Sequence, residues 1–581
     1  MKHISKIISL VQENKSCSVP LVIFLIILSS SLETLTIGMI IPLISSTMEE
    51  NFSSNFANSI SNIFLSLKDY SFFNFLSSEN FIFFILGLFI FLIFMKTFII
   101  IFFAYYQGKF KYRLVIKVAD KIFTKYLKKP YNFFIKENSS MLVRNSTTEV
   151  ETFARSAEAL LSLINEMILF LFILIFLFLF NFKITLLSVI FFSFFSLLYI
   201  LITKKKVIQL GKERQLYRGK SFQFAREAFG AIKEIFIYGK YNFFKNQYLN
   251  SFKKVSMVDW YRQVFNVFPR HFLEFLMFLA AIILIMFYLT SNKEIENIIV
   301  ILAVYAAAGY KLIPSLNRIV VNLQKIELAG PAISVIYEEI KKKESLITHN
   351  PKKETIIFKE KIEIKNLCFS YEKNISILEN LNFEIKKGKM IGIYGESGAG
   401  KSTLIDLICG LHKNYSGLIK IDNKDTRNLD DNWKNKIGYV PQNTYLFDGS
   451  FEKNIAFGES ADNIDQNRLN FAIQNSGLSD LIKSFTEGKK RIIGEKGVSL
   501  SGGQRQRVGI ARALYNNPEI IILDESLNAL DLDTEIKILK SIKKMKDKTV
   551  LLVSHRKNTL DACDEVYKVK NRKISLTNDL L

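Results

Sequence analysis

The sequence of 581 residues is long enough for at least two domains, and 49% of it is hydrophobic. The apolar residues form long runs before residue 315 and then stop, which excludes a wholly soluble enzyme and predicts a membrane half followed by a soluble half. The net charge of +23 would suit a nucleic-acid-binding protein, but much of it lies beside apolar runs, at Lys109–Lys129 and Lys204–Lys220. Cytoplasmic loops of membrane proteins carry such charge, so we expect no nucleic-acid partner.

Six apolar runs have about the 20 residues that cross a bilayer as a helix. We predict spans at Pro20–Ile44, Phe81–Tyr106, Leu160–Phe180, Ile184–Ile202, Phe272–Thr290 and Asn297–Pro314. The links after the second and fourth spans are long and basic, whereas the link after the first is acidic, so both termini are predicted to be cytoplasmic. The four cysteines show no paired spacing, which favours reduced thiols over a disulfide frame or a zinc site.

Several ionisable residues fall inside or near the ends of these spans. Because charge is costly in hydrocarbon, such residues usually face a cavity or a partner. One hypothesis is that Lys96, Arg270 and Arg318 line a path for an anionic substrate. The alternative is mutual pairing, for example of Arg270 with Glu274 one helical turn on, or a side chain that reaches the interface, as Lys311 and Arg318 could near a span end.

The soluble half begins after a run of mixed charge at Glu338–Glu354. Short β-rich runs with Gly-rich turns then alternate with helix-forming stretches, which predicts an α/β domain. We expect a transmembrane domain with cytoplasmic coupling loops over residues 1–337, a linker over 338–360 and the α/β domain over 361–581.

A phosphate-binding loop follows an apolar strand at Met390–Thr403. Its glycines allow backbone N–H groups to surround phosphate, Lys401 can reach the β- and γ-phosphates, and the Ser402 hydroxyl can ligate Mg²⁺. The helix that follows presents its positive end to the anion. The residues assigned to nucleotide binding here are Gly395, Ser397, Gly398, Gly400, Lys401, Ser402 and Thr403.

An acidic pair ends the buried-strand pattern Ile520–Leu523. Asp524 is placed to hold the Mg²⁺ ion, and Glu525 to orient or deprotonate the attacking water. The residues that follow, Ser526–Asn528, are unusual for such a site.

The segment Leu500–Leu514, "LSGGQRQRVGIARAL", is the most specific motif in the chain, and its Ser501, Gly502 and Gly503 open a helix that could hold phosphate. It resembles the signature of the ABC ATPases. That resemblance implies that Ser501–Gln504 complete the phosphate site of a second copy. It also implies that Tyr371 in "CFSYEK" stacks on adenine, that Gln442 in "GYVPQN" touches Mg²⁺ and that His555 in "LLVSHR" contacts the γ-phosphate. Gly494 and Glu495 match an exporter-specific segment before the signature.

The fold class implied by the resemblance is an α-helical membrane domain of ABC exporter type with six transmembrane helices, fused to an α/β P-loop nucleotide-binding domain. One copy of each domain makes half a transporter, so the expected partner is a second copy of the chain in a homodimer, with ATP and Mg²⁺ as cofactors. The loops Lys128–Ser146 and Phe229–Phe244 are candidates for docking on the ATPase domains. Since Ser526–Asn528 lie where this family meets the partner subunit, we expect altered coupling between the two ATP sites.

Three membrane segments, Leu32–Ile44, Phe268–Glu274 and Lys311–Ile319, together resemble the bacterial flippases that turn lipid-linked oligosaccharides across the inner membrane in protein glycosylation. A helix expected at Ile60–Leu67 in the first outer loop fits that family. Its polyprenyl pyrophosphate headgroup is anionic, and buried cations would suit it. The alternatives are an exporter of another lipid, of a glycolipid such as a lipid A precursor, of a drug or of a peptide, and a regulatory membrane protein that binds ATP without turnover.

Overall fold

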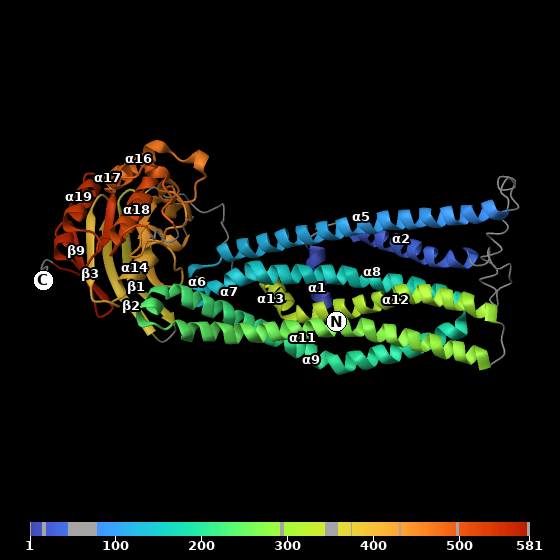
Figure 1. The fold of residues 1–581 in the computed structure, drawn as a ribbon. Helices are drawn as coiled ribbons and strands as arrows, with labels where there is room; N and C mark the ends of the chain where they lie inside the picture. The colour runs from blue at the N-terminus through green and yellow to red at the C-terminus, as the bar shows by residue number, and fades with distance from the viewer. Residues whose placement is uncertain are drawn as a thin grey trace. The chain divides into compact units, whose positions relative to one another are not determined.

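The chain forms two compact units in the computed structural model (Figure 1), which describes residues 2–13, 19–43, 78–290, 295–342, 358–372, 375–428, 431–494, 499–545 and 547–577. A helical unit contains Met1–Leu127 and Asn138–Glu344. The second unit contains Ser345–Leu581 together with Lys128–Glu137, a short stretch from the first half of the sequence. The helix predicted at Ile60–Leu67 lies outside the described residues.

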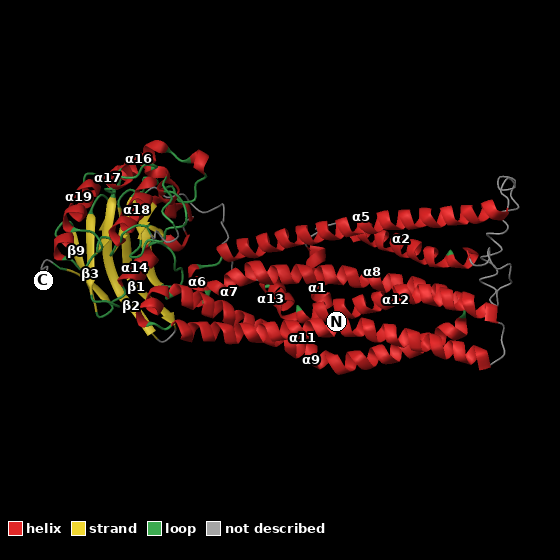
Figure 2. Ribbon diagram, in the orientation of Figure 1, coloured by secondary structure: helices red, strands yellow, loops and turns green. Residues whose placement is uncertain are grey.

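The described part of the helical unit is built mainly from long helices (Figure 2). Its helices are α1 (Lys2–Glu13), α2 (Val19–Gly38), α5 (Ser78–Leu127), α7 (Ser139–Arg144), a π-helical turn at Asn145–Glu149, α8 (Val150–Phe180), α9 (Phe182–Gly230), α10 (Ile232–Tyr238), α11 (Tyr241–Thr290), α12 (Ile295–Leu328) and α13 (Gly330–Lys341).

Among the described residues, five stretches of helix are long and apolar enough to cross a membrane, and a bent pair gives a sixth candidate. The pair α12 and α13 bends by 53°, where Pro331 occupies the first turn of α13 and cannot continue the hydrogen bonding of α12. The five are Pro20–Leu43, Phe83–Leu127, Ser139–Phe180, Phe182–Gly230 and Tyr241–Ile283. The six spans predicted from the sequence correspond to these helices, so the chain is a multi-pass membrane protein.

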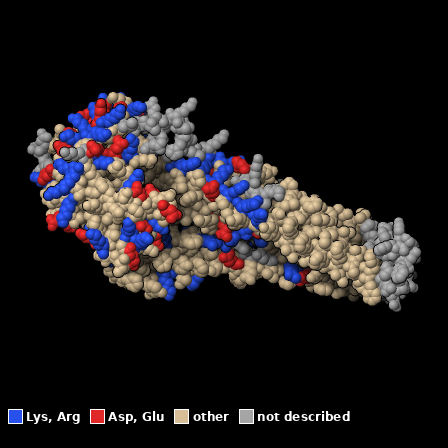
Figure 3. Space-filling view, turned by 90° about the horizontal axis from the view of Figure 1, so that it is seen from above, with Lys and Arg blue, Asp and Glu red and all other residues tan. Residues whose placement is uncertain are grey.

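The apolar parts of these helices pack on one another and leave apolar side chains outside. Ile41, Ile173 and Val304, from the chain between α2 and α5, from α8 and from α12, are fully buried in one cluster. In contrast, Phe94 on α5 is 67% exposed. On the face shown in Figure 3, a long stretch of the helical unit is nearly free of Lys, Arg, Asp and Glu. A surface of this composition matches hydrocarbon rather than water.

The second unit is an α/β domain built on two sheets. The antiparallel sheet has the order β2-β1-β4-β5, and the larger sheet has the order β10-β9-β3-β8-β7-β6. The strands are β1 (Lys361–Glu372), β2 (Ile375–Lys386), β3 (Met390–Gly395), β4 (Ser416–Ile421), β5 (Lys424–Asp425), β6 (Ile437–Val440), β7 (Ile520–Asp524), β8 (Thr549–Val553), β9 (Glu565–Lys570) and β10 (Lys573–Leu576).

The α-helices of this unit lie around its two sheets (Figure 2). They are α6 (Tyr131–Lys136), α14 (Lys401–Ile408), α15 (Phe451–Ile455), α16 (Gln466–Asn475), α17 (Ser479–Lys483), α18 (Gly502–Tyr515), α19 (Leu532–Lys543) and α20 (Lys557–Leu560). Strands β3, β6, β7, β8 and β9 run parallel, and β7 and β8 are buried along their whole length. Central parallel strands are covered on both faces, which explains their nearly continuous apolar sequences.

Candidate nucleotide-binding site

Four loops of the predicted site leave the same edge of the large sheet. Strand β3 ends at Gly395, β6 at Val440, β7 at Asp524 and β8 at Val553. These strands are parallel, so their carboxyl ends meet, and ligands of open α/β sheets bind outside that edge.

The phosphate loop is shaped by glycines that no other residue could replace without strain. Gly398 and Gly400 have φ values of +81° and +97°, and a Cβ at Gly400 would lie 2.8 Å from Leu378. A Cβ at Gly395 would collide with the carbonyl oxygen of Val569. The loop therefore keeps its backbone close to whatever it encloses, as phosphate binding requires.

Lys401 bends back over this loop. Its Nζ donates hydrogen bonds to the carbonyl oxygens of Gly395 at 2.8 Å and Glu396 at 2.9 Å. Burial lowers the pKa of Lys401, and the neighbouring carboxylates Glu525 and Asp524 oppose that shift. The ammonium group thus lies at the loop, where phosphate oxygens could replace the two carbonyl oxygens as its hydrogen-bond acceptors.

The residues predicted to do the chemistry meet around Glu525. Its Oε2 accepts a hydrogen bond from Gln442 Nε2 at 3.0 Å, and its Oε1 lies 2.9 Å from His555 Nε2 and 3.9 Å from Lys401 Nζ. Glu525 has a φ of +48°, a left-handed conformation that is unusual for a glutamate. Such backbone strain persists where the surroundings hold it, often at functional sites.

Asp524 and Ser402 make a set of oxygen ligands that fits Mg²⁺. Asp524 is 6% exposed, and burial, with the neighbouring Glu525 charge, raises its pKa. Its carboxylate accepts a hydrogen bond from Tyr439 at 3.4 Å and interacts with the Ser402 hydroxyl. The described residues contain no group of three or more His, Cys, Asp or Glu able to enclose a metal. The site therefore suits an ion that takes its remaining oxygens from phosphate and water, as Mg²⁺ does.

Tyr371, predicted to stack on adenine, lies beside the phosphate-loop helix. Its hydroxyl is 3.3 Å from Thr403 Oγ1, and its side chain is 40% exposed. The ring meets Phe369 edge-on at 4.9 Å between centroids. The structure thus brings Tyr371 next to the loop while leaving part of it open to a ligand. Ser397 lies in the loop itself, as predicted.

The signature residues form the start of α18. Ser501 Oγ accepts a hydrogen bond from Gln504 N at 3.2 Å, and Gln504 Oε1 accepts one from Ser501 N at 2.8 Å, a reciprocal cap of the helix. Gly503 passes so close to Ala529 that a Cβ would lie 2.8 Å from its carbonyl oxygen, while Gly502 has more room. Within the described parts of this single chain, no hydrogen bond or ion pair joins Ser501–Gln504 to the phosphate loop. Gly494 has a φ of +75°, and Glu495 lies outside the described residues.

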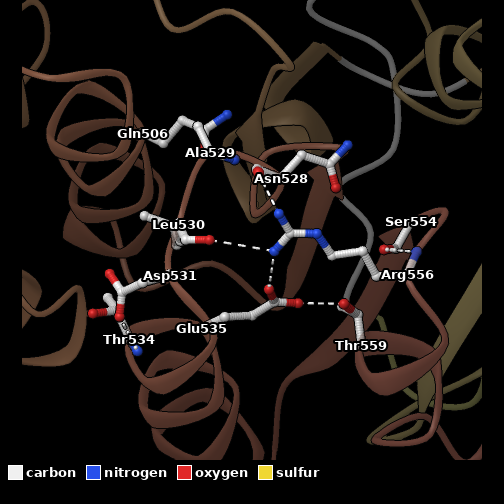
Figure 4. Close-up of polar contacts among 10 residues, drawn as sticks. All are labelled: Gln506, Asn528, Ala529, Leu530, Asp531, Thr534, Glu535, Ser554, Arg556 and Thr559. Atoms are coloured by element: carbon white, nitrogen blue, oxygen red, sulfur yellow. Dashed lines mark hydrogen bonds and ion pairs between the residues drawn. The ribbon is translucent and has the colours of Figure 1, made fainter.

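The unusual segment after Glu525 is held from within its own domain (Figure 4). The sequence placed the whole of Ser526–Asn528 at a partner surface. The structure instead buries Ser526 and Leu527, at 1% and 2% exposure, and Leu527 joins the apolar core of the domain. Asn528 is half-buried and Ala529 is exposed. Leucine is therefore tolerated because it packs inward.

Three residues that the sequence did not single out hold this segment. Arg556 donates to the carbonyl oxygens of Asn528 at 2.6 Å and Leu530 at 3.3 Å, and to Glu535 Oε2 at 2.7 Å (Figure 4). Gln506, on the signature helix, accepts from Ala529 N at 3.2 Å and donates to the Gln442 carbonyl at 3.3 Å. We name Arg556, Glu535 and Gln506 the segment clamp. In the sequence, the position of the basic residue Arg556 directly after His555 could have indicated that it lies near the site.

The cations predicted to line a substrate path have carboxylate partners. Glu33 Oε1 lies 2.7 Å from Lys311 and 3.9 Å from Lys96, which brings α5, α2 and α12 together. Arg318 Nε lies 2.9 Å from Glu166 on α8, and Glu166 is close enough to Glu33 for their charges to interact. We name these five residues the membrane charge cluster.

Arg270 is not part of this cluster. Its Nε binds Glu274 Oε1 at 2.8 Å on its own helix, α11, where Glu274 also lies 3.1 Å from His271. The structure thus brings Lys96 and Arg318 into one network and gives Arg270 the pairing that the alternative hypothesis described.

Sequence and structure comparisons identify the family of both units. Residues 20–307 match the family of ABC transporter transmembrane regions, and residues 378–528 match the ABC transporter family. A solved structure, described as that of a bacterial Atm1-family ABC exporter with ATP bound, has the same fold, with a TM-score of 0.72 over 96% of this chain and 94% of that one, at 20% identity. The chain belongs to the ABC transporters and joins their transmembrane region to their ATPase domain.

Two relatives of this ABC transporter have names that refer to export or to translocation. A putative export ATP-binding/permease protein of Rickettsia bellii is 41% identical over 209 residues, 35% of this chain and 36% of that protein. The leukotoxin translocation ATP-binding protein LktB of Mannheimia glucosida is 41% identical over 216 residues, 37% of this chain and 30% of that protein. The chain matches only about a third of the length of each relative, so the similarity does not establish the cargo.

Proposed function

We propose that this half-transporter hydrolyses ATP to move an anionic amphipath across a bacterial inner membrane, with its ATPase domain in the cytoplasm. The observation that carries the ATPase proposal is the meeting of Lys401, Gln442 and His555 around Glu525 within 4 Å. These residues have matched parts in phosphoryl transfer: Lys401 places charge on the phosphates, Gln442 orients the attacking water and Glu525 removes its proton. A protein that only held ATP would have no need for the last of these.

The chemistry is divided among the residues as follows. The backbone N–H groups of Gly398–Gly400 and the Lys401 ammonium bind the β- and γ-phosphates, and Tyr371 stacks on the base. Ser402, Asp524 and Gln442 would hold Mg²⁺, which supplies positive charge to the phosphates. Glu525 accepts the proton of the attacking water, and the hydrogen bond from Gln442 keeps Oε2 oriented toward it. His555 holds Oε1 and is placed to contact the γ-phosphate.

The working unit we propose is a homodimer in which Ser501–Gln504 of each copy complete the phosphate site of the other. Two features support it: the signature residues have no contact with the phosphate loop of their own chain within the described residues, and Ala529 is exposed beside them. A variant with Ala529→Cys as its one cysteine, combined with Glu525→Gln to prevent turnover, should form a disulfide between copies when ATP is added. A band that stays at the mass of one chain, with and without ATP, would remove this arrangement.

For the cargo we propose a lipid-linked oligosaccharide, recognised through its pyrophosphate. The membrane charge cluster contains three cations, Lys96, Lys311 and Arg318, but two carboxylates, Glu33 and Glu166, so it carries an excess of positive charge. Arg318 is 54% exposed and Lys311 32% exposed, so both can reach a ligand. Arginine is well suited to a pyrophosphate because its planar group forms paired hydrogen bonds with phosphate oxygens.

The cargo proposal is tested by the stimulation of ATP hydrolysis in the reconstituted protein. A short-chain polyprenyl pyrophosphate oligosaccharide should stimulate the wild type, and Lys96→Gln and Arg318→Gln should weaken that stimulation about tenfold each while leaving unstimulated hydrolysis intact. Arg270→Gln is the matched control, because Arg270 is an arginine of the membrane helices that lies outside the cluster. Equal losses in all three variants would refute the cluster as the binding site.

The same assay separates the other cargoes. A lipid A precursor, an uncharged polyprenyl glycan, a hydrophobic drug and an unfolded polypeptide serve as competing probes, the last because one relative is named for leukotoxin translocation. Stimulation by the uncharged glycan equal to that by the pyrophosphate would exclude recognition of the anion. A protein that binds ATP but never hydrolyses it, with every probe, would support the regulatory alternative.

A further inference from the structure

A buried imidazole lies next to the nucleotide site and takes no part in the proposed chemistry. His412 is 1% exposed, and among the described residues neither of its ring nitrogens has a hydrogen-bond partner. The nearest charged group, Asp406 Oδ2, is 3.8 Å from Nε2, beyond hydrogen-bond distance. An unpaired polar group in the core costs free energy, so the packing of this ring should explain why it is there.

The His412 ring contacts two separate elements. Tyr131, the first residue of α6, meets it at 5.8 Å between centroids with an interplanar angle of 62°. Phe369 and Tyr371, both on β1, meet it at 5.0 Å and 5.4 Å, and the Tyr371 contact is nearly perpendicular at 83°. Edge-to-face contacts of this kind fix the relative orientation of the rings as well as their distance.

Tyr371 connects this packing to the nucleotide. Its hydroxyl approaches Thr403 of the phosphate-loop helix at 3.3 Å, and its exposed surface is available to a base. Residues of α6 and of the segment around Tyr371 also line one cavity, among them Asn132, Ile135, Lys136, Ser370 and Asn414. The helix α6 belongs to the same compact unit as the ATPase domain, although its residues come from the loop between the second and third membrane helices.

We propose that His412 is a positioning residue that couples the base-stacking Tyr371 to α6, so that the base of a nucleoside triphosphate and the docked α6 stabilise each other. The proposal rests on the nucleotide site described above and concerns how occupancy of that site reaches α6. The ring contacts of His412 reach Tyr371 and not Lys401, so we expect the coupling to depend on the base far more than on the phosphates. Because such coupling is reciprocal, a change on α6 must alter nucleotide affinity even though α6 holds none of the phosphate-binding residues.

The test compares two probes on the full-length protein in lipid nanodiscs: ATP, and inorganic tripolyphosphate, which lacks base and ribose. Tyr131→Ala should weaken ATP binding about threefold to tenfold and leave tripolyphosphate binding unchanged. Tyr131→Phe keeps the ring and should bind both probes like the wild type. Phe134→Ala, on the same helix but without a ring contact to His412, is the matched control and should also be unchanged.

A double-mutant cycle assigns the effect to His412. In a His412→Leu background, Tyr131→Ala should cause no further loss of ATP affinity, whereas His412→Phe should retain the full sensitivity to Tyr131→Ala because it keeps the ring. Additive losses, equal losses for both probes, or a Tyr131→Ala variant that binds ATP like the wild type would each overturn the proposal. If His412→Leu does not fold, the Tyr131 variants and two probes still decide it. A wild type that binds tripolyphosphate but not ATP would instead overturn the proposed nucleotide site.

Discussion

The segment clamp offers a quantitative test, through the change Arg556→Leu. Arg556 donates hydrogen bonds to the carbonyl oxygens of Asn528 and Leu530 and to the carboxylate of Glu535 (Figure 4). Its neighbour His555 contacts Glu525. Two adjacent residues therefore hold both ends of the segment that links Glu525, proposed as the base, to the exposed Ala529.

The size of the effect follows from the burial of the pair. The Glu535 side chain is 3% exposed, so removing its cation leaves a buried charge whose remaining donor among the described residues is Thr559. Breaking a buried pair costs about 3 to 5 kcal/mol, and the 37% exposure of Arg556 places this case near 3 kcal/mol. For a domain of this size that corresponds to a fall in Tm of about 6 to 12 °C.

The assay is thermal unfolding of the solubilised full-length chain, followed beside ATP hydrolysis well below the transition. Adding Glu535→Gln to Arg556→Leu removes the stranded charge and should regain about 2 kcal/mol of the loss. The rate of ATP hydrolysis should stay about tenfold below that of the wild type in both variants, because the Asn528 and Leu530 carbonyl oxygens no longer accept hydrogen bonds from Arg556. Arg468→Leu, which removes an exposed pair with Asp465, is the control and should cost less than about 1 kcal/mol. A double variant that regains turnover along with stability would refute the positioning role.

Three further predictions concern single residues of the ATPase domain. Glu525→Gln should bind ATP and lose turnover, and hydrolysis at the wild-type rate would exclude Glu525 as the base. Burial opposes ionisation of Asp422, yet backbone N–H donors of Lys359, Glu360 and Lys361 hold its pKa below the usual value. Because this pKa is lowered, the ionised Asp422 stabilises the folded state above about pH 4. That contribution is lost as pH falls through the folded pKa. Asp422→Asn should thus lower Tm at neutral pH, with a difference that shrinks in acid, and a constant difference would contradict this. Burial raises the pKa of Cys409 to about 12, so iodoacetamide at about pH 8 should modify it in the unfolded chain and leave it intact in the native one, as mass spectrometry would show.

The membrane helices and the phosphate loop were predictable because their signals are local. A run of about 20 apolar residues indicates a transmembrane helix, and the glycine spacing of residues 395–400 indicates a phosphate-binding loop. The sequence did not predict that the helices run far past the apolar runs, as α9 does to Gly230, because the basic continuation has no apolar periodicity wide enough to indicate a helix.

The contacts that join distant positions were not predictable from one sequence. Glu33 pairs with Lys311, 278 residues further along, and nothing in either segment indicates the other. Leu527 was expected from the family resemblance to lie at a partner surface, whereas its apolar side chain lies in the domain core. His412 lies in no recognisable sequence motif. Its ring packs against Tyr131 of α6, whose residues belong to the ATPase unit although they come from the first half of the sequence.

The central claim is that ATP turnover at Glu525 moves an anionic lipid across the bilayer. The most direct measurement is the ATP-dependent loss of a fluorescent polyprenyl pyrophosphate oligosaccharide from one leaflet of proteoliposomes, for the wild type and for Glu525→Gln. The account predicts movement in the wild type with ATP, and none in the variant or without nucleotide. Steady ATP hydrolysis by the wild type with no movement of this lipid, or equal movement in the variant, would contradict it.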